Sequence, residues 1–145
     1  MSATVPRTPE SRHVPHRAGA DPAHTAFVLL RVGFTVLPIV LGLDKFTNIL
    51  TTWENYLAPW AVDLLPVSAH TAMLVVGVVE VLAGVLVAIR PRIGAYVVAL
   101  WLAGIVVNLL SFGYYDIALR DVGLLVGALA LGLLAGAHDR PRRAG

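Results

Sequence analysis

The stretch VVGVVEVLAGVLV, residues Val75–Val87, decides how this chain must fold. Twelve of its thirteen residues are aliphatic or glycine, and the exception, Glu80, lies at its centre. The surrounding apolar segment runs from about Ser68 to Ile89, which is long enough to cross a bilayer as a helix. An ionised side chain at that depth costs about 2.5–3.5 kcal/mol on insertion scales, so Glu80 is expected to face other helices and to find a partner there.

The composition agrees with a membrane protein. The 145 residues are 57% hydrophobic and 14% charged, whereas soluble domains are about 45–50% apolar and about 25% charged. There is no cysteine, which excludes disulfides, thiolate zinc sites, iron–sulfur clusters and thiol redox chemistry within this chain. From the high hydrophobic fraction and the low charged fraction, we expect an integral membrane protein whose main partner is the lipid bilayer and which binds no nucleic acid.

Three further apolar segments predict an all-α, four-transmembrane-helix bundle. Asp21, Ser68 and Asp116 are the expected helix caps, and the short Arg90–Arg92 segment predicts a tight hairpin. The bundle would form one membrane domain, 25–138, between a disordered N-terminal tail, 1–24, and a basic C-terminal tail, 139–145. The predicted spans are 25–43, 68–89, 93–112 and 117–137.

The distribution of Lys and Arg predicts the orientation. The N-terminal tail, the 90–92 hairpin and the C-terminal tail share one face of a four-span bundle, which predicts that both termini are cytoplasmic. The long outer loop, 44–67, carries an amphipathic segment that Pro59 should bend. We expect its aromatic side chains to form an interfacial belt rather than a substrate platform. The cytoplasmic arginines are Arg7, Arg12, Arg17, Arg90, Arg92, Arg140, Arg142 and Arg143, and the amphipathic side chains are Phe46, Leu50, Trp53, Leu57 and Trp60.

Polar residues within the spans are the candidate site. Counting the helical rise from the cytoplasmic boundary allows an ion pair between Arg31 and Glu80, and Gly77 and Gly84 share the face of Glu80, so a second helix can approach closely. The remaining polar residues would form a second cluster near the outer boundary. The predicted interior pocket is lined by Arg31, Lys45, Glu80, Asn108, Arg120 and Asp121.

The role of Glu80 has two interpretations at this level. It can be the structural partner of Arg31, or it can be a proton-linked carboxylate or a hydrogen-bonding anchor for a quinone headgroup. His24 and His138 both lie near the cytoplasmic boundary, which makes a bis-histidine haem conceivable. Their position at the span ends argues against it, because haem ligands usually lie within the bundle.

Four segments resemble the DoxX family of small four-helix bacterial membrane proteins. They are LRVGF (30–34), LGLDKF (41–46), GVVEVLAGVLVAIRPRIGA (77–95) and YYDIALRDVGLLVGALAL (114–131). The resemblance covers about residues 25–137, and the long Trp-rich outer loop departs from the shortest members of the family.

This resemblance implies a multi-pass protein of the bacterial cytoplasmic membrane. The family is similar to the small subunit of thiosulfate:quinone oxidoreductase. The resemblance thus implies an accessory or quinone-linked subunit with quinone as the candidate cofactor and a soluble or membrane oxidoreductase subunit as partner. The lack of cysteine argues against sulfur chemistry in this chain. A small transporter and a structural scaffold without its own activity remain the alternatives.

Overall fold

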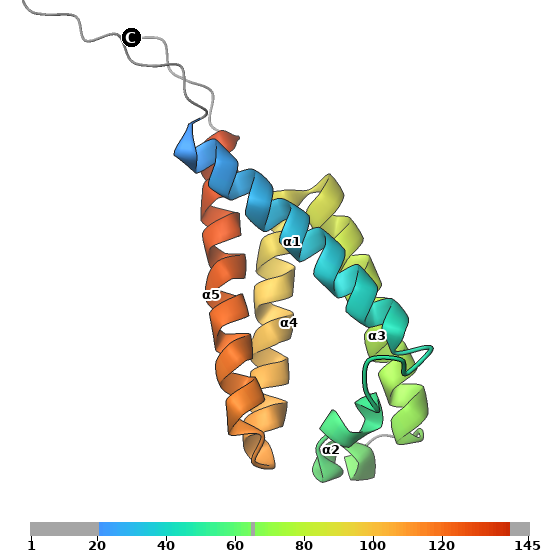
Figure 1. Ribbon diagram of the computed structural model, residues 1–145. Helices are drawn as coiled ribbons and strands as arrows, with labels where there is room; N and C mark the ends of the chain where they lie inside the picture. Colours follow the sequence, from blue (N-terminus) through green and yellow to red (C-terminus); the bar gives the residue numbers. More distant parts are fainter. Residues whose placement is uncertain (1–20, 65, 140–145) are drawn as a thin grey trace, which may run out of the picture.

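The described part of the chain folds into four long helices and two short ones (Figure 1). The computed structural model describes residues 21–64 and 66–139, and these ranges contain helices and no strand. The predicted tails, apart from residues 21–24 and Asp139, lie outside the described residues. Helices α1, α3, α4 and α5 are each long and apolar enough to cross a membrane, which confirms the predicted four-helix membrane architecture. The elements are α1 (Pro22–Asp44), η1 (Trp53–Tyr56), α2 (Pro59–Leu64), α3 (Ala69–Ile89), α4 (Pro91–Ser111) and α5 (Tyr115–His138).

Two of the three predicted helix caps are confirmed. The carboxylate of Asp21 accepts a hydrogen bond from the amide of Ala23 at 3.1 Å, and Ser68 Oγ accepts one from the amide of Thr71 at 3.2 Å. The prediction for Asp116 was wrong, because α5 begins at Tyr115 and Asp116 lies within its first turn. The preceding Gly113 has a φ of +96°, a left-handed conformation that lets the chain reverse in fewer residues than expected.

The long helices form two pairs, α1 with α3 and α4 with α5 (Figure 1). Arg90 ends α3 and also precedes the first residue of α4, so the predicted tight hairpin is confirmed. The start of α1 and the end of α5 lie together, and we call this end of the bundle the termini end. The opposite end, which carries residues 45–68, is the loop end. The two helix pairs move apart toward the loop end (Figure 1).

Glycines bring α1 and α3 into close contact, as the sequence predicted for Gly77 and Gly84. A Cβ atom built on Gly42 would lie 2.6 Å from the carbonyl oxygen of Gly77. One built on Gly84 would lie 2.7 Å from the carbonyl oxygen of Thr35. These two contacts define the antiparallel register, in which Gly42 faces Gly77 and Thr35 faces Gly84, and a methyl group at either contact would force the backbones apart.

The buried apolar core fills the termini half of the bundle. The rings of Phe34 and Tyr96 pack against Gly127 and Gly132 on α5. A Cβ atom built on Gly127 would lie 3.2 Å from the Phe34 ring, and one built on Gly132 would lie 3.0 Å from the Tyr96 ring. At Gly123 an added Cβ meets nothing within 4 Å, because the helix pairs have already separated at that level. The loop half is thereby left open. The core consists of Phe27, Phe34, Ala83, Val87, Ala95, Val98, Ala99, Ala128, Leu131 and Ala135.

Candidate functional site

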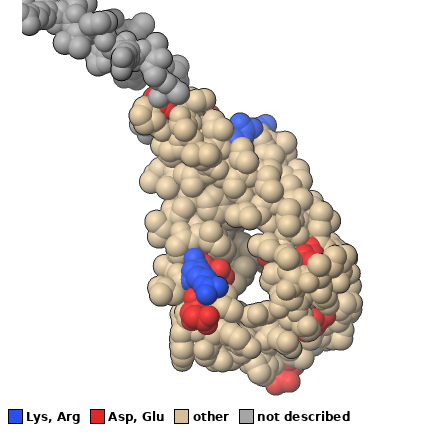
Figure 2. Space-filling model, viewed as in Figure 1, with Lys and Arg blue, Asp and Glu red and all other residues tan. Residues whose placement is uncertain are grey.

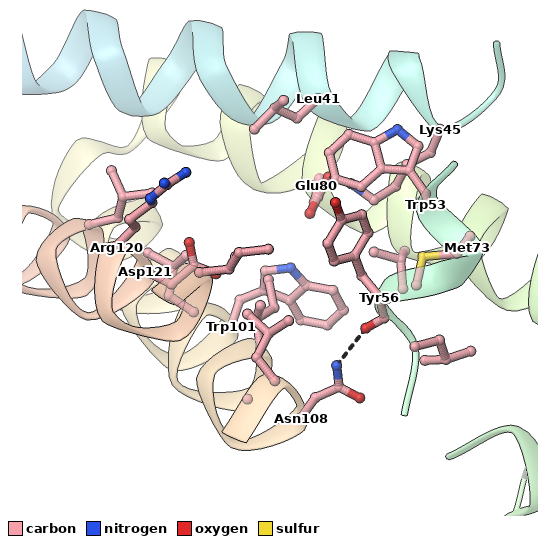
Figure 3. A pocket seen from close by; sticks show the side chains of 18 of the residues that line it. Leu41, Lys45, Trp53, Tyr56, Met73, Glu80, Trp101, Asn108, Arg120 and Asp121 are labelled. Carbon is pink, nitrogen blue, oxygen red and sulfur yellow. Dashed lines mark hydrogen bonds and ion pairs between the residues drawn. The ribbon is translucent and has the colours of Figure 1, made fainter. Parts of the chain in front are cut away.

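A cavity of about 510 Å³ occupies the loop half, between the two helix pairs. Figure 2 shows the bundle hollowed there, with basic and acidic atoms gathered beside the opening. Helices α1, α3, α4 and α5 all contribute to its wall, and the loop around η1 closes its end. Of the six residues predicted for the interior pocket, five line this cavity (Figure 3): Lys45, Glu80, Asn108, Arg120 and Asp121.

An ion pair between Lys45 and Glu80 forms one wall of the cavity. Lys45 Nζ lies 2.6 Å from Glu80 Oε2, and the two side chains are 4% and 12% exposed. The same ammonium group lies 3.8 Å from the centre of the Trp53 ring, close enough for a cation–π interaction. The charge of Lys45 is therefore balanced on one side by a carboxylate and on the other by an aromatic face.

The predicted pair between Arg31 and Glu80 was wrong. Arg31 instead donates a hydrogen bond to the carbonyl oxygen of Ala88, in the last turn of α3. The register explains this difference. Arg31 lies four residues before Thr35 and Ala88 lies four residues after Gly84, so the two share one level. Glu80 lies eight residues, about 12 Å, from that level. The last carbonyl groups of a helix lack partners within the helix and favour a cation.

Lys45 reaches Glu80 because the two residues lie on opposite sides of the glycine contact. Each is three residues beyond its own glycine, Gly42 or Gly77, on antiparallel helices. This leaves an axial offset of about 9 Å, which an extended lysine side chain spans when the helices are in close contact. The prediction grouped Lys45 with the residues of the outer boundary and so missed its true partner.

Asp44 shapes the loop that covers the cavity. Its carboxylate accepts hydrogen bonds from the amides of Ile49 and Leu50, at 3.1 and 3.2 Å, and from Trp53 Nε1 at 2.7 Å. These bonds turn the chain back over the end of α1 and place Trp53 above Lys45. The sequence showed Asp44 only as the residue at which the first span gives way to the outer loop. Its role depends on contacts with residues several positions later, and a spacing pattern does not reveal such contacts.

The amphipathic segment of the outer loop is interrupted near Pro59, where the sequence predicted that it would break or bend. It contains the short η1 and α2, and Pro59 begins α2, a position that suits its missing N–H. In the first part of the loop, the backbone amides bond to the Asp44 carboxylate and do not form a helical turn. The belt interpretation fits Trp60, which is 51% exposed. It does not fit Trp53 and Leu57, because both line the cavity.

Asn108 fastens this loop to α4. Its Nδ2 donates to the carbonyl oxygen of Tyr56 at 2.8 Å, drawn as a dashed line in Figure 3. Its Oδ1 accepts from the amide of Ala58 at 3.1 Å. Both ends of the amide are thus committed to the loop, so Asn108 acts as a clamp rather than as a free polar group.

The expected outer cluster of four polar residues does not form a connected network. Lys45 pairs with Glu80, and Asn108 holds the loop. Arg120 and Asp121 border the same cavity from α5. Within residues 21–64 and 66–139, the salt bridges are Lys45–Glu80 and His70–Glu54, so neither Arg120 nor Asp121 takes part in one.

Trp101 was not included in the predicted pocket. Its indole lines the cavity from α4 (Figure 3). Its Nε1 is buried and lies near the Glu80 carboxylate, but it makes no hydrogen bond of ordinary geometry among the described residues. A buried donor without a full hydrogen bond costs about 1–3 kcal/mol. An acceptor that enters the cavity, from a ligand or from water, would complete its bonding.

A second contact ties the loop to the start of α3. Glu54 Oε1 lies 2.7 Å from His70 Nδ1, and this hydrogen bond lowers the pKa of the Glu54 carboxyl. Together with Asp44 and Asn108, the contact holds the loop on three sides. The cavity therefore has a fixed cover at its loop end.

His24 and His138 meet at the termini end. His24 Nδ1 lies 3.1 Å from His138 Nε2, and the ring of His138 stacks on Phe27 with centroids 4.7 Å apart. The two imidazoles are in direct contact, so a porphyrin cannot lie between them. The pair joins the start of α1 to the end of α5 and is remote from the cavity, which leaves the cavity as the candidate site.

No protein-family model, curated protein or solved structure matches this chain. A functional conclusion therefore has to start from the chemistry of the cavity itself. That chemistry consists of apolar walls, two aromatic side chains from the loop, an internally neutralised ion pair and one N–H donor without a full hydrogen bond. Such a site suits a flat, apolar ligand that carries a hydrogen-bond acceptor.

Proposed function

We propose that this chain is the membrane subunit of a quinone-linked oxidoreductase system and that its cavity binds the headgroup of a lipid-soluble quinone. The observation that carries the proposal is the buried Nε1 of Trp101, which makes no hydrogen bond of ordinary geometry among the described residues, in a cavity that combines apolar walls with charges of both signs. The resemblance of four sequence segments to the DoxX family supports the same function. The arginine distribution and that resemblance support the part of the proposal that puts the protein in a bacterial cytoplasmic membrane with both termini in the cytoplasm.

A quinone headgroup fits the chemistry of the cavity. It has a flat apolar ring and carbonyl oxygens that accept hydrogen bonds but donate none. Trp101 Nε1 would donate to one carbonyl, and the rings of Trp53 and Tyr56 offer surfaces for stacking. Both aromatic side chains line the same cavity.

The charges around the cavity favour a neutral ligand. Lys45 and Glu80 neutralise each other at 2.6 Å, and Arg120 and Asp121 add one charge of each sign. An anion or a cation entering this space would have to lose its hydration without gaining a net opposite charge. A neutral quinone avoids that penalty.

The proposed role is binding and positioning within a larger system. A bound quinone supplies the two-electron redox chemistry, and the chain has no cysteine with which to hold an iron–sulfur cluster. The electrons would therefore pass to or from a partner oxidoreductase subunit. The residues of this chain would hold the ring, exclude water and keep the loop closed over it.

Replacing Trp101 by phenylalanine tests the proposed donor. The Trp101→Phe variant keeps an aromatic ring in the wall but removes the N–H, so the loss of one hydrogen bond, about 1 kcal/mol, should weaken quinone binding about fivefold. Binding would be measured in lipid nanodiscs by gel filtration in the presence of a short-tailed benzoquinone, which absorbs in the ultraviolet.

Trp60→Phe is the matched control. Trp60 lies outside the cavity and donates to Ser111 Oγ at 2.8 Å, so its replacement should leave the quinone affinity unchanged. Equal affinities for Trp101→Phe and the wild type would refute the donor assignment. Absence of saturable quinone binding to the wild type would refute the proposed function and leave the transporter and scaffold alternatives.

A further inference from the structure

The cavity continues into a groove between α3 and α4. The groove has a volume of about 330 Å³ and is lined by aliphatic side chains of residues 79–86 and 97–100. Trp101 and Gly104 line both hollows. Gly104 has no side chain, so at this position no side chain separates the cavity from the groove.

The groove faces the lipid and runs toward the middle of the membrane. Leu82 and Leu100, on its two walls, are 62% and 77% exposed. Gly104 lies seven residues, about 10 Å, from the end of α4 at Ser111, and Val97 lies about 21 Å from it. The polar cavity is therefore the part nearer the membrane surface at the loop end. The apolar groove crosses the level of the bilayer centre, because Val97 lies six residues, about 9 Å, from the start of α4 at Pro91.

We propose that the groove holds the hydrocarbon tail of the same ligand whose headgroup occupies the cavity. The ligand is thus an amphiphile that enters sideways from the bilayer, between α3 and α4. The order of the two hollows matches an amphiphile whose head lies toward the surface at the loop end and whose tail reaches across the bilayer centre. The proposal rests on the proposed function for the identity of the head, and it adds that the tail is recognised by the protein.

Leu100 allows a test that leaves the headgroup cavity intact. It lines the groove but not the cavity, and its side chain is 77% exposed, so a tryptophan there would narrow the groove from its lipid face rather than enter a neighbouring helix. Leu133 on α5 is 68% exposed and lines neither hollow. Leu100→Trp is therefore the test variant, and Leu133→Trp is its matched control.

The experiment compares two benzoquinones that share one headgroup, one without a tail and one with a ten-carbon tail. Each is titrated into the wild type and both variants in nanodiscs of the same lipid, so partitioning into lipid cancels in the ratio of variant to wild-type affinity. Leu100→Trp should leave the tail-less quinone within about twofold of wild type and weaken the tailed quinone about fivefold, because tail binding from lipid rests on packing alone. Leu133→Trp should change neither affinity.

Three results would overturn the inference. Equal weakening of both quinones by Leu100→Trp would show that the substitution acts on the headgroup cavity and not on a tail site, and unchanged binding of the tailed quinone would remove the groove as a tail site. Either result leaves the proposed function standing, whereas a wild type that binds neither quinone overturns the proposed function and the groove together. If Leu100→Trp fails to fold, Val97→Trp, at another residue that lines the groove and not the cavity, should weaken the tailed quinone alone.

Discussion

Replacing Gly42 by alanine is expected to destabilise the protein by about 2 kcal/mol. The added Cβ would lie 2.6 Å from the carbonyl oxygen of Gly77 and 2.9 Å from Val81 Cγ2. Neither the Gly77 backbone nor the branched Val81 can move aside without shifting α3, so α1 and α3 must separate. The free energy of unfolding would be measured by titrating the protein with sodium dodecyl sulfate in mixed micelles.

Gly33→Ala is the matched control on the same helix. An added Cβ at Gly33 meets nothing within 4 Å, so only the intrinsic helix preference changes, and alanine should stabilise the helix by up to about 1 kcal/mol. The two variants should thus shift the free energy of unfolding in opposite directions. Equal effects of the two substitutions would show that the Gly42–Gly77 contact does not hold the helices together.

Replacing Lys45 by methionine is expected to have the largest effect on stability, a loss of about 3 kcal/mol. Methionine keeps much of the length of the side chain but leaves Glu80, 12% exposed, without its cation. The uncompensated carboxylate must then be protonated or hydrated, and both outcomes favour the unfolded state. The same detergent titration measures the loss.

The double variant Lys45→Met/Glu80→Met separates the ion pair from the individual side chains. Removing both charges leaves no unpaired group, so the double variant should recover most of the stability lost by Lys45→Met alone. Arg31→Met should not show this coupling with Glu80→Met, since Arg31 bonds to Ala88. Additive losses for Lys45 and Glu80 would contradict a direct pair.

Much of the fold could be predicted because local signals carry it. The apolar runs predicted four spans, Asp21 and Ser68 predicted two helix starts, and Gly77 and Gly84 predicted which face of α3 meets another helix. These features depend on residues close together in the chain. The start of α5 could not be placed as well, because the conformation of Gly113 shortened the preceding turn.

The partners within the site were harder to predict, because they depend on how α1 and α3 align. Composition and depth made Arg31 a plausible partner for Glu80, and only the glycine contacts show that Arg31 lies level with Ala88 instead. The loop presents the same difficulty. Its helical spacing suggested an amphipathic segment that Pro59 breaks or bends, and the spacing did not show that Asp44 organises the preceding backbone by contacts over five to nine residues.

Photoaffinity labelling with an azido-benzoquinone tests most directly whether the cavity is the quinone site. The protein in nanodiscs would be irradiated with the probe, and mass spectrometry would locate the label. We expect labelling on α4 between Trp101 and Asn108 and on the loop from Trp53 to Leu57, suppressed by an excess of unlabelled quinone. Labelling spread over lipid-facing residues such as Leu29 and Leu133, and unaffected by unlabelled quinone, would contradict this.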